Sequence, residues 1–463
     1  MFGSKKFEII WDSKALSEAL GVVVADNIYA SELHINSKDV SPGSIFIALA
    51  GDKSDGHKYV SDSLNMGAEI AIVSKIPSEN IDPNKLILVH DCLEAINLMA
   101  KYKRNKSKAI FLGITGSVGK TSLKEAAKCA FSSLGKTFCS RGNFNNNLGL
   151  LLNLASMSDD SKYCIFELGM NNSGEMRILS NILLPDIAII NNVYNTHQAN
   201  FLSTKDIALA KAEILEGLDK ETGIVILPKS NEFYSLLESC AKKLRIKNIY
   251  SFGENENSTS MNFNSCTNEL ASYKNNLSGQ EISVNHNNLP NYHLLNFAPI
   301  LLSAQLLNLD ITAMTKALES YEIYTGRGNI IHVTKNDFYI IDDSYNSSPS
   351  ALEASIKYFS QLKLKRKIIL LGDMLELGKQ EVEEHSKFVN IIKNTDIDIV
   401  VTYGNLASFI SKGLEVNKIT FHSNNLDDIK HFIKSIIRPK DYILVKASAS
   451  TKLSEVVTFL NEE

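Results

Sequence analysis

The stretch Gly113-Ile114-Thr115-Gly116-Ser117-Val118-Gly119-Lys120-Thr121 decides the fold of the region around it. The short apolar run 108–112 before it is typical of a buried strand, and the helix formers of 122–131 follow it. Strand, glycine-rich turn and helix predict a phosphate-binding loop, in which backbone N–H groups and a helix N-terminus face an anion. We expect Lys120 to reach the β- and γ-phosphates and the Thr121 hydroxyl to bind Mg²⁺. Ile114 occupies the first glycine position of the strict pattern, so the loop is a variant.

Length and charge narrow the possible functions. The 463 residues, 44% of them hydrophobic, are enough for about three domains of ~150 residues. A net charge of −4 argues against a nucleic-acid partner. The six cysteines have no C-x-x-C spacing, and no long apolar segment follows Met1. We therefore expect a cytoplasmic protein without membrane insertion. We also expect a monomer.

The first predicted domain comprises residues 1–84. Its apolar runs 45–49 and 69–73 predict strands, and 58–67 predicts a helix between them. The segment 77–83 contains two prolines and predicts a linker to the next domain.

The second predicted domain, residues 85–325, carries the phosphate-binding loop. Short apolar runs at 163–166, 186–190 and 223–227 alternate with helical segments, which predicts a doubly wound, mostly parallel sheet. The Asn- and Ser-rich segment 254–291 predicts loops and short, exposed antiparallel strands, and 294–309 predicts a buried helix.

The third predicted domain, residues 326–463, repeats the α/β alternation. Four apolar runs separated by helical stretches predict a second, Rossmann-like α/β domain, with strands at 338–341, 367–371, 397–401 and 442–446. Ligands bind at the carboxyl ends of the strands in such sheets. Three of those ends are polar here, at 342–346, 372–374 and 446–448, which favours a binding site.

Two side chains follow strands of the central domain and are candidate metal ligands. Glu167 ends the strand 163–166, where a carboxylate either binds Mg²⁺ or caps the next helix. His197 follows the strand 186–190, and a structural and a metal-binding role are equally compatible with its position.

Two cations also have alternative interpretations. Lys211 falls in the apolar register of the helix 205–218. Either its stem packs while its ammonium reaches water, or the side chain has a chemical role. Arg327 stands between two glycines at a domain junction, where it contacts a phosphate or is solvated in a turn.

With these residues the chain resembles the Mur ligases over nearly its whole length. The resemblance rests on segments of all three predicted domains, which are Gly113–Ser122, Asn143–Gly149, Glu167–Asn171, Gly174–Glu175, Ile190–Val193 with His197, Ala210–Ile214, Gly326–Arg327, Asp343–Asn346 with Pro349, Leu371–Gly378 with His385, and Val445–Ser448. Some positions depart from the family pattern: Asn36-Ser37-Lys38 stands where Asp-Ser-Arg is usual, and Ala447 and Ala449 replace a Gly and an Arg.

The resemblance implies an ATP-dependent amide-bond ligase. Its N-terminal domain would bind a uridine nucleotide. The segments 343–346 and 371–378 point to the member that joins UDP-N-acetylmuramoyl-tripeptide to D-alanyl-D-alanine through an acyl phosphate. Another amino-acid ligase of the superfamily, or an inactive nucleotide-dependent switch, is the alternative.

The resemblance also implies roles for individual residues. Lys120, Lys211, His197 and Arg327 would be catalytic. ATP would be held by Thr115, Gly116, Ser117, Val118, Gly119, Lys120, Thr121, Ser122, Asn296, Arg327 and Asp343. Thr121 and Glu167 would bind one of two Mg²⁺ ions, and His197 with a carbamylated Lys211 the other. The peptide substrates would contact Ser37, Lys38, Asn146, Asn147, Asn346, Lys446 and Ser448.

Overall fold

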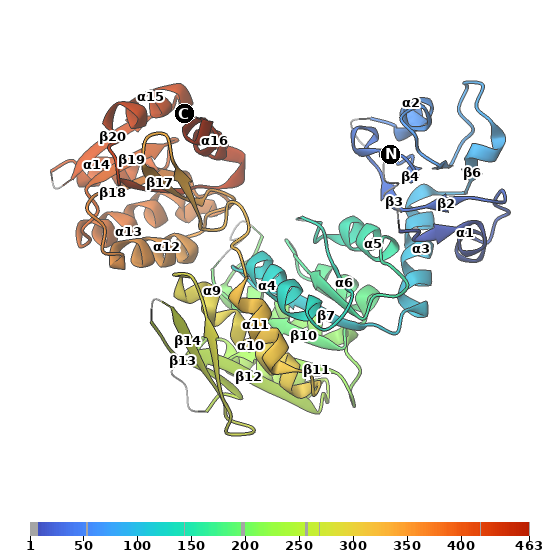
Figure 1. The fold of residues 1–463 in the computed structure, drawn as a ribbon, viewed down its shortest axis with the longest axis horizontal. Helices are drawn as coiled ribbons and strands as arrows, with labels where there is room; N and C mark the ends of the chain where they lie inside the picture. Colours follow the sequence, from blue (N-terminus) through green and yellow to red (C-terminus); the bar gives the residue numbers. More distant parts are fainter. Residues whose placement is uncertain are drawn as a thin grey trace.

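The protein forms three α/β units that follow one another along the chain (Figure 1). The structure, a computed structural model, describes residues 8–51, 54–142, 144–195, 200–254, 258–267, 269–416 and 418–462. The N-terminal and C-terminal units lie on opposite sides of the central one (Figure 1). None of the helices in these ranges combines the length and hydropathy that a membrane span requires.

The N-terminal unit is built on a four-stranded parallel sheet. Its strands, in spatial order, are β3 (Glu32–His34), β4 (Ser44–Ile47), β5 (Ile70–Val73) and β6 (Leu86–Leu88). Helix α2 (Val60–Asn65) connects β4 to β5, as predicted. Strands β1 (Trp11–Asp12) and β2 (Tyr29–Ala30) form an antiparallel pair, and α1 (Ser13–Leu20) lies between them in sequence.

The predicted boundary at residue 84 is one strand too early. Strand β6 pairs in parallel with β5, so the proline-containing segment 77–83 is a loop within this sheet and not a linker between domains. The prediction failed because β6 has only three residues, too few to show a hydrophobic period.

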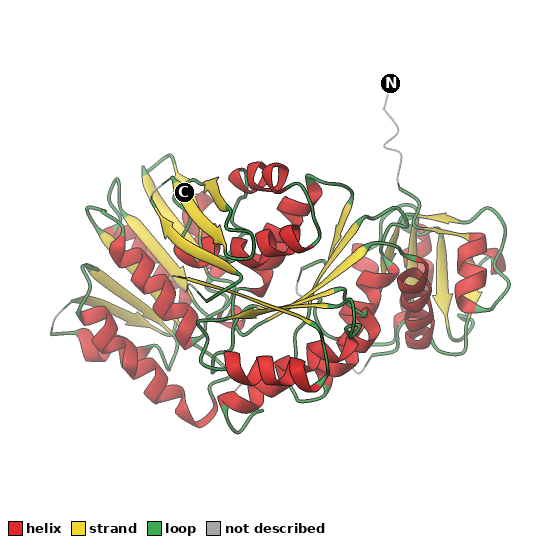
Figure 2. Cartoon of the chain, turned by 90° about the horizontal axis from the view of Figure 1, so that it is seen from below, coloured by secondary structure: helices red, strands yellow, loops and turns green. Residues whose placement is uncertain are grey.

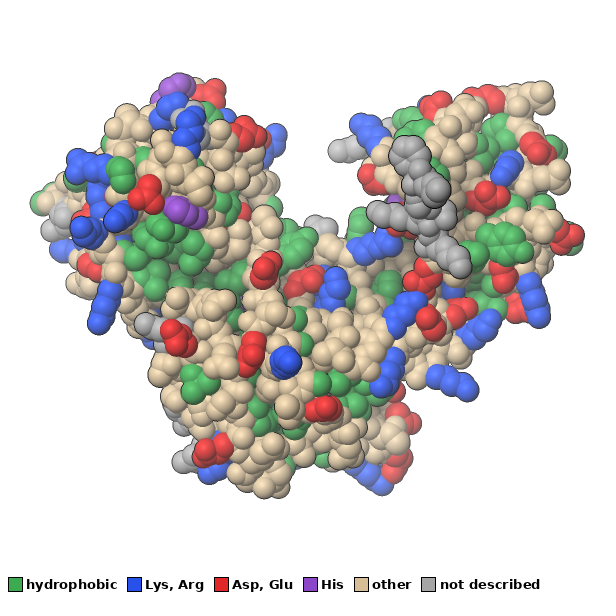
Figure 3. All heavy atoms as spheres, viewed as in Figure 1, with side chains coloured by type: hydrophobic (Ala, Val, Ile, Leu, Met, Phe, Trp, Pro, Cys, Tyr) green, Lys and Arg blue, Asp and Glu red, His purple; other side chains and the backbone are tan. Residues whose placement is uncertain are grey.

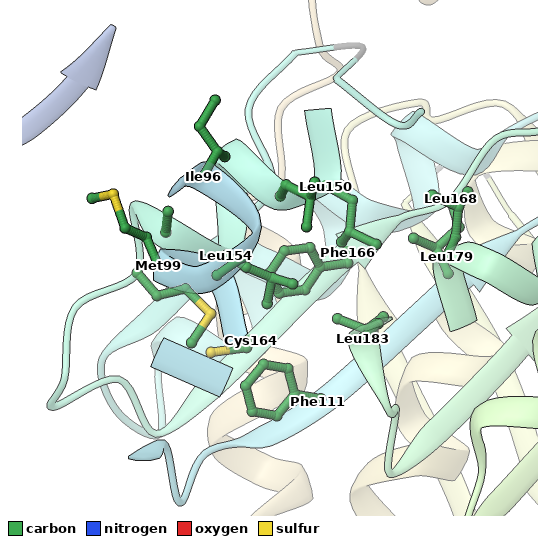
Figure 4. Close-up of a cluster of buried hydrophobic side chains, with 14 of the residues drawn as sticks. Ile96, Met99, Phe111, Leu150, Leu154, Cys164, Phe166, Leu168, Leu179 and Leu183 are labelled. Carbon is green, nitrogen blue, oxygen red and sulfur yellow. The ribbon is translucent and has the colours of Figure 1, made fainter. Parts of the chain in front are cut away.

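Helix α3 (Cys92–Lys106) joins the N-terminal unit to the central one. Its side chains Ile96 and Met99 are buried with Leu150 and Leu154 of α5 (Asn147–Ala155) in one hydrophobic cluster (Figure 4). That cluster also contains core residues of the N-terminal sheet. The two units therefore share a continuous apolar core.

Trp11 reinforces this junction. Its indole Nε1 donates a hydrogen bond to the carbonyl of Ala155 at 2.8 Å, and the Nζ of Lys103 lies 4.7 Å from the ring centroid. Lys103 in turn donates to Asp159 at 2.6 Å, so its buried charge is paired.

The central unit contains a nine-stranded sheet. Its order is β15-β14-β13-β12-β11-β10-β7-β9-β8, parallel from β8 to β13 and antiparallel beyond. The strands are β7 (Ile110–Thr115), β8 (Thr137–Cys139), β9 (Tyr163–Glu167), β10 (Ile187–Ile190), β11 (Ile224–Pro228), β12 (Asn248–Glu254), β13 (Met261–Cys266), β14 (Leu270–Asn275) and β15 (Glu281–Asn285). The helices are α4 (Lys120–Ser132), α5, α6 (Glu175–Leu183), α7 (Thr204–Ala212), α8 (Tyr234–Lys243), α9 (Asn291–Leu295), α10 (Phe297–Leu306) and α11 (Ile311–Glu319).

The prediction of exposed strands in 254–291 is only half right. The strands are antiparallel, but Phe263, Tyr273 and Val284 are buried in the same hydrophobic cluster as α10. Strands β14 and β15 bury only every second residue, so their apolar content is low although one face is packed. The predicted buried helix at 294–309 is confirmed, divided at Asn296 into α9 and α10.

The C-terminal unit is a doubly wound sheet, as predicted, and it contains β16 and β20 in addition to the four predicted strands. Its order is β16-β17-β21-β18-β19-β20, parallel except for the edge strand β16, with helices on both faces (Figure 2). The strands are β16 (Asn329–Val333), β17 (Phe338–Asp343), β18 (Lys367–Gly372), β19 (Ile399–Tyr403), β20 (Ile419–Ser423) and β21 (Tyr442–Lys446). The helices are α12 (Pro349–Gln361), α13 (Glu381–Lys393), α14 (Ser408–Leu414), α15 (Leu426–Ile436) and α16 (Ser454–Glu462). Its two apolar clusters, one on each face, are separate from those of the central unit.

Candidate active site

A cavity of about 870 Å³ lies where the central and C-terminal units meet. It is lined by loops that follow strands of both sheets, where ligands of doubly wound folds bind. The predicted site residues that line it are Ser117, Val118, Gly119, Lys120, Thr121, Ser122, Asn146, Glu167, Lys211, Asn296, Arg327, Asp343, Asn346, Lys446 and Ser448. Figure 3 shows the face of the molecule hollowed between its outer units.

The loop between β7 and α4 has the backbone of an anion-binding turn. Gly119 has φ +76°, and a Cβ there would lie 2.9 Å from the Asn191 side chain, so only glycine fits. Helix α4 begins at the next residue, Lys120, whose Nζ donates to the carbonyl of Gly116 at 2.8 Å. Burial lowers the pKa of Lys120, against the opposing effect of Glu167. The lysine is therefore held at the loop by a bond that a phosphate could replace.

Glu167 is a buried carboxylate whose two oxygens are held by different groups. Its Oε2 accepts a hydrogen bond from the Thr121 hydroxyl at 2.8 Å, and its Oε1 accepts from the Asn145 amide at 2.9 Å. Hydroxyl and carboxylate oxygens are ligands that Mg²⁺ prefers. The position is therefore more than a helix cap, since the carboxylate faces the phosphate-binding loop.

Lys211 is almost completely buried. It is 2% exposed on α7, and no acceptor among the described residues bonds its Nζ. Burial, and then the charge of Lys120, lower the pKa of Lys211 well below its usual range. The neighbouring Glu213 is engaged with the backbone N–H of Gly174 at 2.9 Å. The first of the two interpretations from the sequence, a packed stem with its ammonium in water, is therefore wrong.

Arg327 bridges the two units. Its Nη2 donates to the Thr121 hydroxyl at 3.0 Å, and its guanidinium stacks over the Tyr345 ring at 3.8 Å. The Nε of Arg327 is buried without an acceptor among the described residues. The backbone carbonyl of Arg327 is 3.0 Å from Nε2 of His293, a side chain that is 1% exposed. The guanidinium thus sits at the phosphate-binding loop with an unused donor.

The strand ends of the C-terminal sheet carry a buried ion pair. Asp343 accepts from the Lys446 Nζ at 2.7 Å and from the Ser355 hydroxyl at 2.6 Å. The hydroxyl of Ser448 accepts from the backbone N–H of Leu375 at 3.0 Å. Across the cavity, Asn296 accepts from the Asn191 amide at 3.2 Å.

Comparison with known proteins agrees with this arrangement. Residues 30–104 match the Mur ligase family catalytic domain, residues 114–303 the Mur ligase middle domain, and residues 312–449 the Mur ligase glutamate ligase domain. The chain belongs to the Mur ligase family. Members of this family are ATP-dependent ligases that form amide bonds, and this chain is an enzyme of that class.

Several Mur ligases resemble the chain along its full length. The UDP-N-acetylmuramoyl-tripeptide–D-alanyl-D-alanine ligase of Rickettsia prowazekii is 40% identical, covering 97% of this chain and 100% of that protein. The enzyme of the same name from Bacillus subtilis is 29% identical, covering 92% of each. A crystal structure of MurF from Acinetobacter baumannii is 25% identical, with a TM-score of 0.82 over 98% of this chain and 99% of the other. MurF of Thermotoga maritima in complex with ADP has the same fold, at 24% identity and a TM-score of 0.76 over 93% and 97%.

Some predicted site residues of this Mur ligase lie outside the cavity. Thr115 and Gly116 are buried in the loop beneath it, and Asn147 is exposed in the first turn of α5. Ser37 and Lys38 lie in a short turn of the N-terminal unit.

His197 lies outside the described residues. Its predicted metal-binding role stays a prediction. Within the described ranges, no group of three His, Cys, Asp or Glu side chains could hold a metal ion by itself.

The sequence did not single out Asn145. It assigned Asn146 and Asn147 to substrate, but Asn146 caps α5 by accepting from the Gly149 N–H at 2.9 Å. It is Asn145 that orients Glu167. The Asn-rich motif marked the loop, but no local signal distinguishes which of three adjacent amides turns toward a carboxylate on another strand.

Proposed function

We propose that this Mur ligase joins the terminal carboxylate of UDP-N-acetylmuramoyl-tripeptide to the amine of D-alanyl-D-alanine, in cytoplasmic synthesis of peptidoglycan precursors. The names of its full-length relatives support this choice of substrates. One structural observation supports the reaction type: a single cavity joins a phosphate-binding loop to polar strand ends of the C-terminal unit, with Arg327 bonded across the junction to Thr121.

In this reaction a carboxylate oxygen attacks the γ-phosphorus of ATP, the bond to ADP breaks, and an acyl phosphate forms. The dipeptide amine then attacks the acyl carbon, inorganic phosphate leaves, and the amine loses a proton. The first step brings two anions together, and one such charge pair at 4 Å costs about 1 kcal/mol in water and about 4 kcal/mol at an effective dielectric constant of 20. Lys120 and Arg327 face the loop where that repulsion develops.

The residues present suit a divalent cation beside the loop. Thr121 and Glu167 would hold one Mg²⁺ through hard oxygen ligands, and the buried carboxylate lies within hydrogen-bond distance of the hydroxyl. Bound Mg²⁺ would neutralise phosphate charge. The second ion of our prediction would be held by His197 and a modified Lys211.

We assign the remaining contacts as the family resemblance suggests. The N-terminal unit would bind the uridine nucleotide with Ser37 and Lys38. Asn296 would meet adenine, Asp343 the ribose, and Asn346, Lys446 and Ser448 the dipeptide. Residues 326–463 would then form the dipeptide-binding domain.

We further propose that Lys211 is carbamylated. A neutral amine attacks CO₂, a nitrogen–carbon bond forms, and loss of a proton leaves an anionic carbamate. The support is the buried, unbonded Nζ, whose pKa is lowered well below its usual range, so that the reactive neutral amine is favoured. A carbamate would also replace a repelling ammonium by an oxygen ligand for a cation.

The modification has its own test. Lys211→Ala should lose activity, and a short carboxylic acid should restore part of it by filling the vacated ligand position. Native mass spectrometry should detect the added CO₂ on the wild-type chain. Full activity of an enzyme rigorously depleted of CO₂, with unmodified Lys211, would refute this proposal.

The reaction is tested by phosphate release. UDP-N-acetylmuramoyl-tripeptide and ATP should give sustained turnover only when D-alanyl-D-alanine is added. Turnover with single amino acids and not with the dipeptide would indicate another ligase of the family. ATP hydrolysis independent of both peptide substrates would indicate a nucleotide-dependent switch.

A further inference from the structure

The N-terminus of helix α12 has unused hydrogen-bond donors. The helix runs from Pro349 to Gln361, and the side chain of its N-cap residue, Ser348, makes no capping bond. The first bond within the helix joins the Leu352 N–H to the Ser348 carbonyl at 2.8 Å. The N–H groups of Ser350 and Ala351 therefore have no acceptor within the described ranges. An uncapped end of this kind carries partial positive charge.

Three serine hydroxyls surround this helix end, and none has a partner among the described residues. Ser347, Ser348 and Ser350 all line the cavity, and the Oγ atom of each is buried. Ser347 is 5% exposed, and its N–H donates to the Asn346 side-chain oxygen at 2.9 Å. Its hydroxyl has no partner among the described residues. Buried hydroxyls are normally bonded. Free hydroxyls together with free N–H groups at a helix N-terminus form a seat for an anion.

The charge around this seat favours a singly charged ligand. The nearby Lys446 donates to the carbonyl of Asn346 at 3.1 Å, but its charge is paired with Asp343 at 2.7 Å. A phosphate group in a protein site usually has an unpaired lysine or arginine beside it, as the phosphate-binding loop has in Lys120 and Arg327. The α12 seat offers neutral donors instead, which suit a carboxylate.

We propose that Ser347 and the N-terminus of α12 bind the C-terminal carboxylate of D-alanyl-D-alanine. This assignment rests on the proposed function, whose reaction brings the ATP phosphates, the reacting tripeptide carboxylate and the dipeptide carboxylate into the cavity. The ATP phosphates have the phosphate-binding loop, and the tripeptide carboxylate must meet the γ-phosphate there. The dipeptide carboxylate needs a partner of its own, and the α12 seat belongs to the C-terminal unit, which we propose binds the dipeptide, whereas that loop belongs to the central unit.

The first test pairs a variant with a changed substrate. Ser347→Ala should raise the KM for D-alanyl-D-alanine about tenfold, the loss expected when one hydrogen bond to a charged group is removed. The KM for ATP and for the UDP-linked tripeptide should not change. Wild-type enzyme should discriminate strongly against the C-terminal amide of the dipeptide, and the variant should discriminate less. Ser360→Ala, at the other end of α12 and outside the cavity, is the matched control.

The second test separates binding from helix stability. In Ser348→Asp the new carboxylate should cap α12 and raise the Tm, while it occupies the seat and raises the dipeptide KM at least tenfold. A purely structural role for this end predicts a higher Tm with unchanged KM, which would overturn the proposal. A higher KM for ATP, or weaker product inhibition by inorganic phosphate, with unchanged dipeptide KM would show a phosphate seat and also overturn it. Wild-type turnover that does not depend on the dipeptide would refute the proposed function, and the seat with it.

Discussion

Lys120 bonds only carbonyls of its own loop in the described structure, so its side chain contributes little to the fold. Lys120→Ala should therefore lower kcat by about 100-fold or more, because a charge that stabilises the transition state is lost. The Tm should stay within the error of the wild-type value. Steady-state kinetics and a thermal melt measure the two quantities. A loss of less than about tenfold, worth about 1.4 kcal/mol, would contradict the assignment of the loop.

His293 predicts a pH dependence of stability. Burial lowers its pKa to about 4, from an ordinary value of 6.5. Between these values the unfolded chain binds the proton and the folded chain does not, so stability is complete above pH 6.5 and falls as the pH is lowered toward 4. At pH 5 the loss is about 2 kcal/mol.

The variant His293→Gln isolates this contribution. Glutamine can still donate to the Arg327 carbonyl, but it does not titrate. The difference between the Tm values at pH 7 and pH 5 should therefore be smaller in the variant. An equal difference in both proteins would show that another group is responsible.

At the scale of elements, helix α4 follows the phosphate-binding loop and also contacts the segment around Ser140 through a buried lysine. Lys124, one turn after Lys120, is fully buried, and its Nζ donates to the carbonyl of Ser140 at 2.8 Å while lying 3.1 Å from the Glu125 carboxylate. The Ser140 hydroxyl oxygen in turn accepts a hydrogen bond from the backbone N–H of Glu167 at 3.1 Å. Lys124 thereby ties α4 to the segment that carries the predicted metal ligand.

Replacing this lysine should destabilise the protein. Lys124→Met keeps most of the apolar stem but leaves the Ser140 carbonyl and the Glu125 carboxylate without their partner, at a cost of about 1–3 kcal/mol. Urea unfolding measures the change. Lys128→Met, an exposed position on the same helix, is the control and should change stability by less than about 0.5 kcal/mol. Equal effects of the two substitutions would argue against the tie.

Local patterns predicted most of the elements but not the contacts between them. The phosphate-binding loop is continuous in sequence, so its strand, turn and helix could be predicted from 108–131 alone. Strand β6 was too short to show a period, and β14 and β15 bury only alternate residues. The bond between Asn145 and Glu167 and that between Arg327 and Thr121 depend on chain folding, and nothing near either residue specifies its partner.

At the scale of the whole molecule, the two outer units are attached differently. The N-terminal unit shares an apolar core with the central one through α3. The described contacts of the C-terminal unit with the central one include polar bonds such as that of Tyr358 to the Asn288 carbonyl at 3.1 Å, while its apolar clusters are its own. Polar contacts exchange with water at little cost, so the C-terminal unit is the one that we expect to move.

The C-terminal unit should close over bound substrates by rotation near Thr325 to Gly328. Closure would exclude water from the acyl phosphate. Small-angle scattering with a non-hydrolysable ATP analogue and UDP-N-acetylmuramoyl-tripeptide should show a smaller radius of gyration than the free enzyme. ADP alone is the control for nucleotide binding without the second substrate. An unchanged profile under saturating ligands would count against closure.

Trp11 is the one tryptophan of the sequence, and its indole is buried at the junction of the N-terminal and central units. The intrinsic tryptophan emission of the whole protein therefore comes from this single place. An equilibrium unfolding curve followed by that emission reports the loss of the N-terminal junction, and a curve followed by circular dichroism reports helices in all three units. If the C-terminal unit unfolds first, the circular dichroism changes at a denaturant concentration at which the tryptophan emission does not. The difference between the midpoints of the two curves therefore measures how independently that unit is folded.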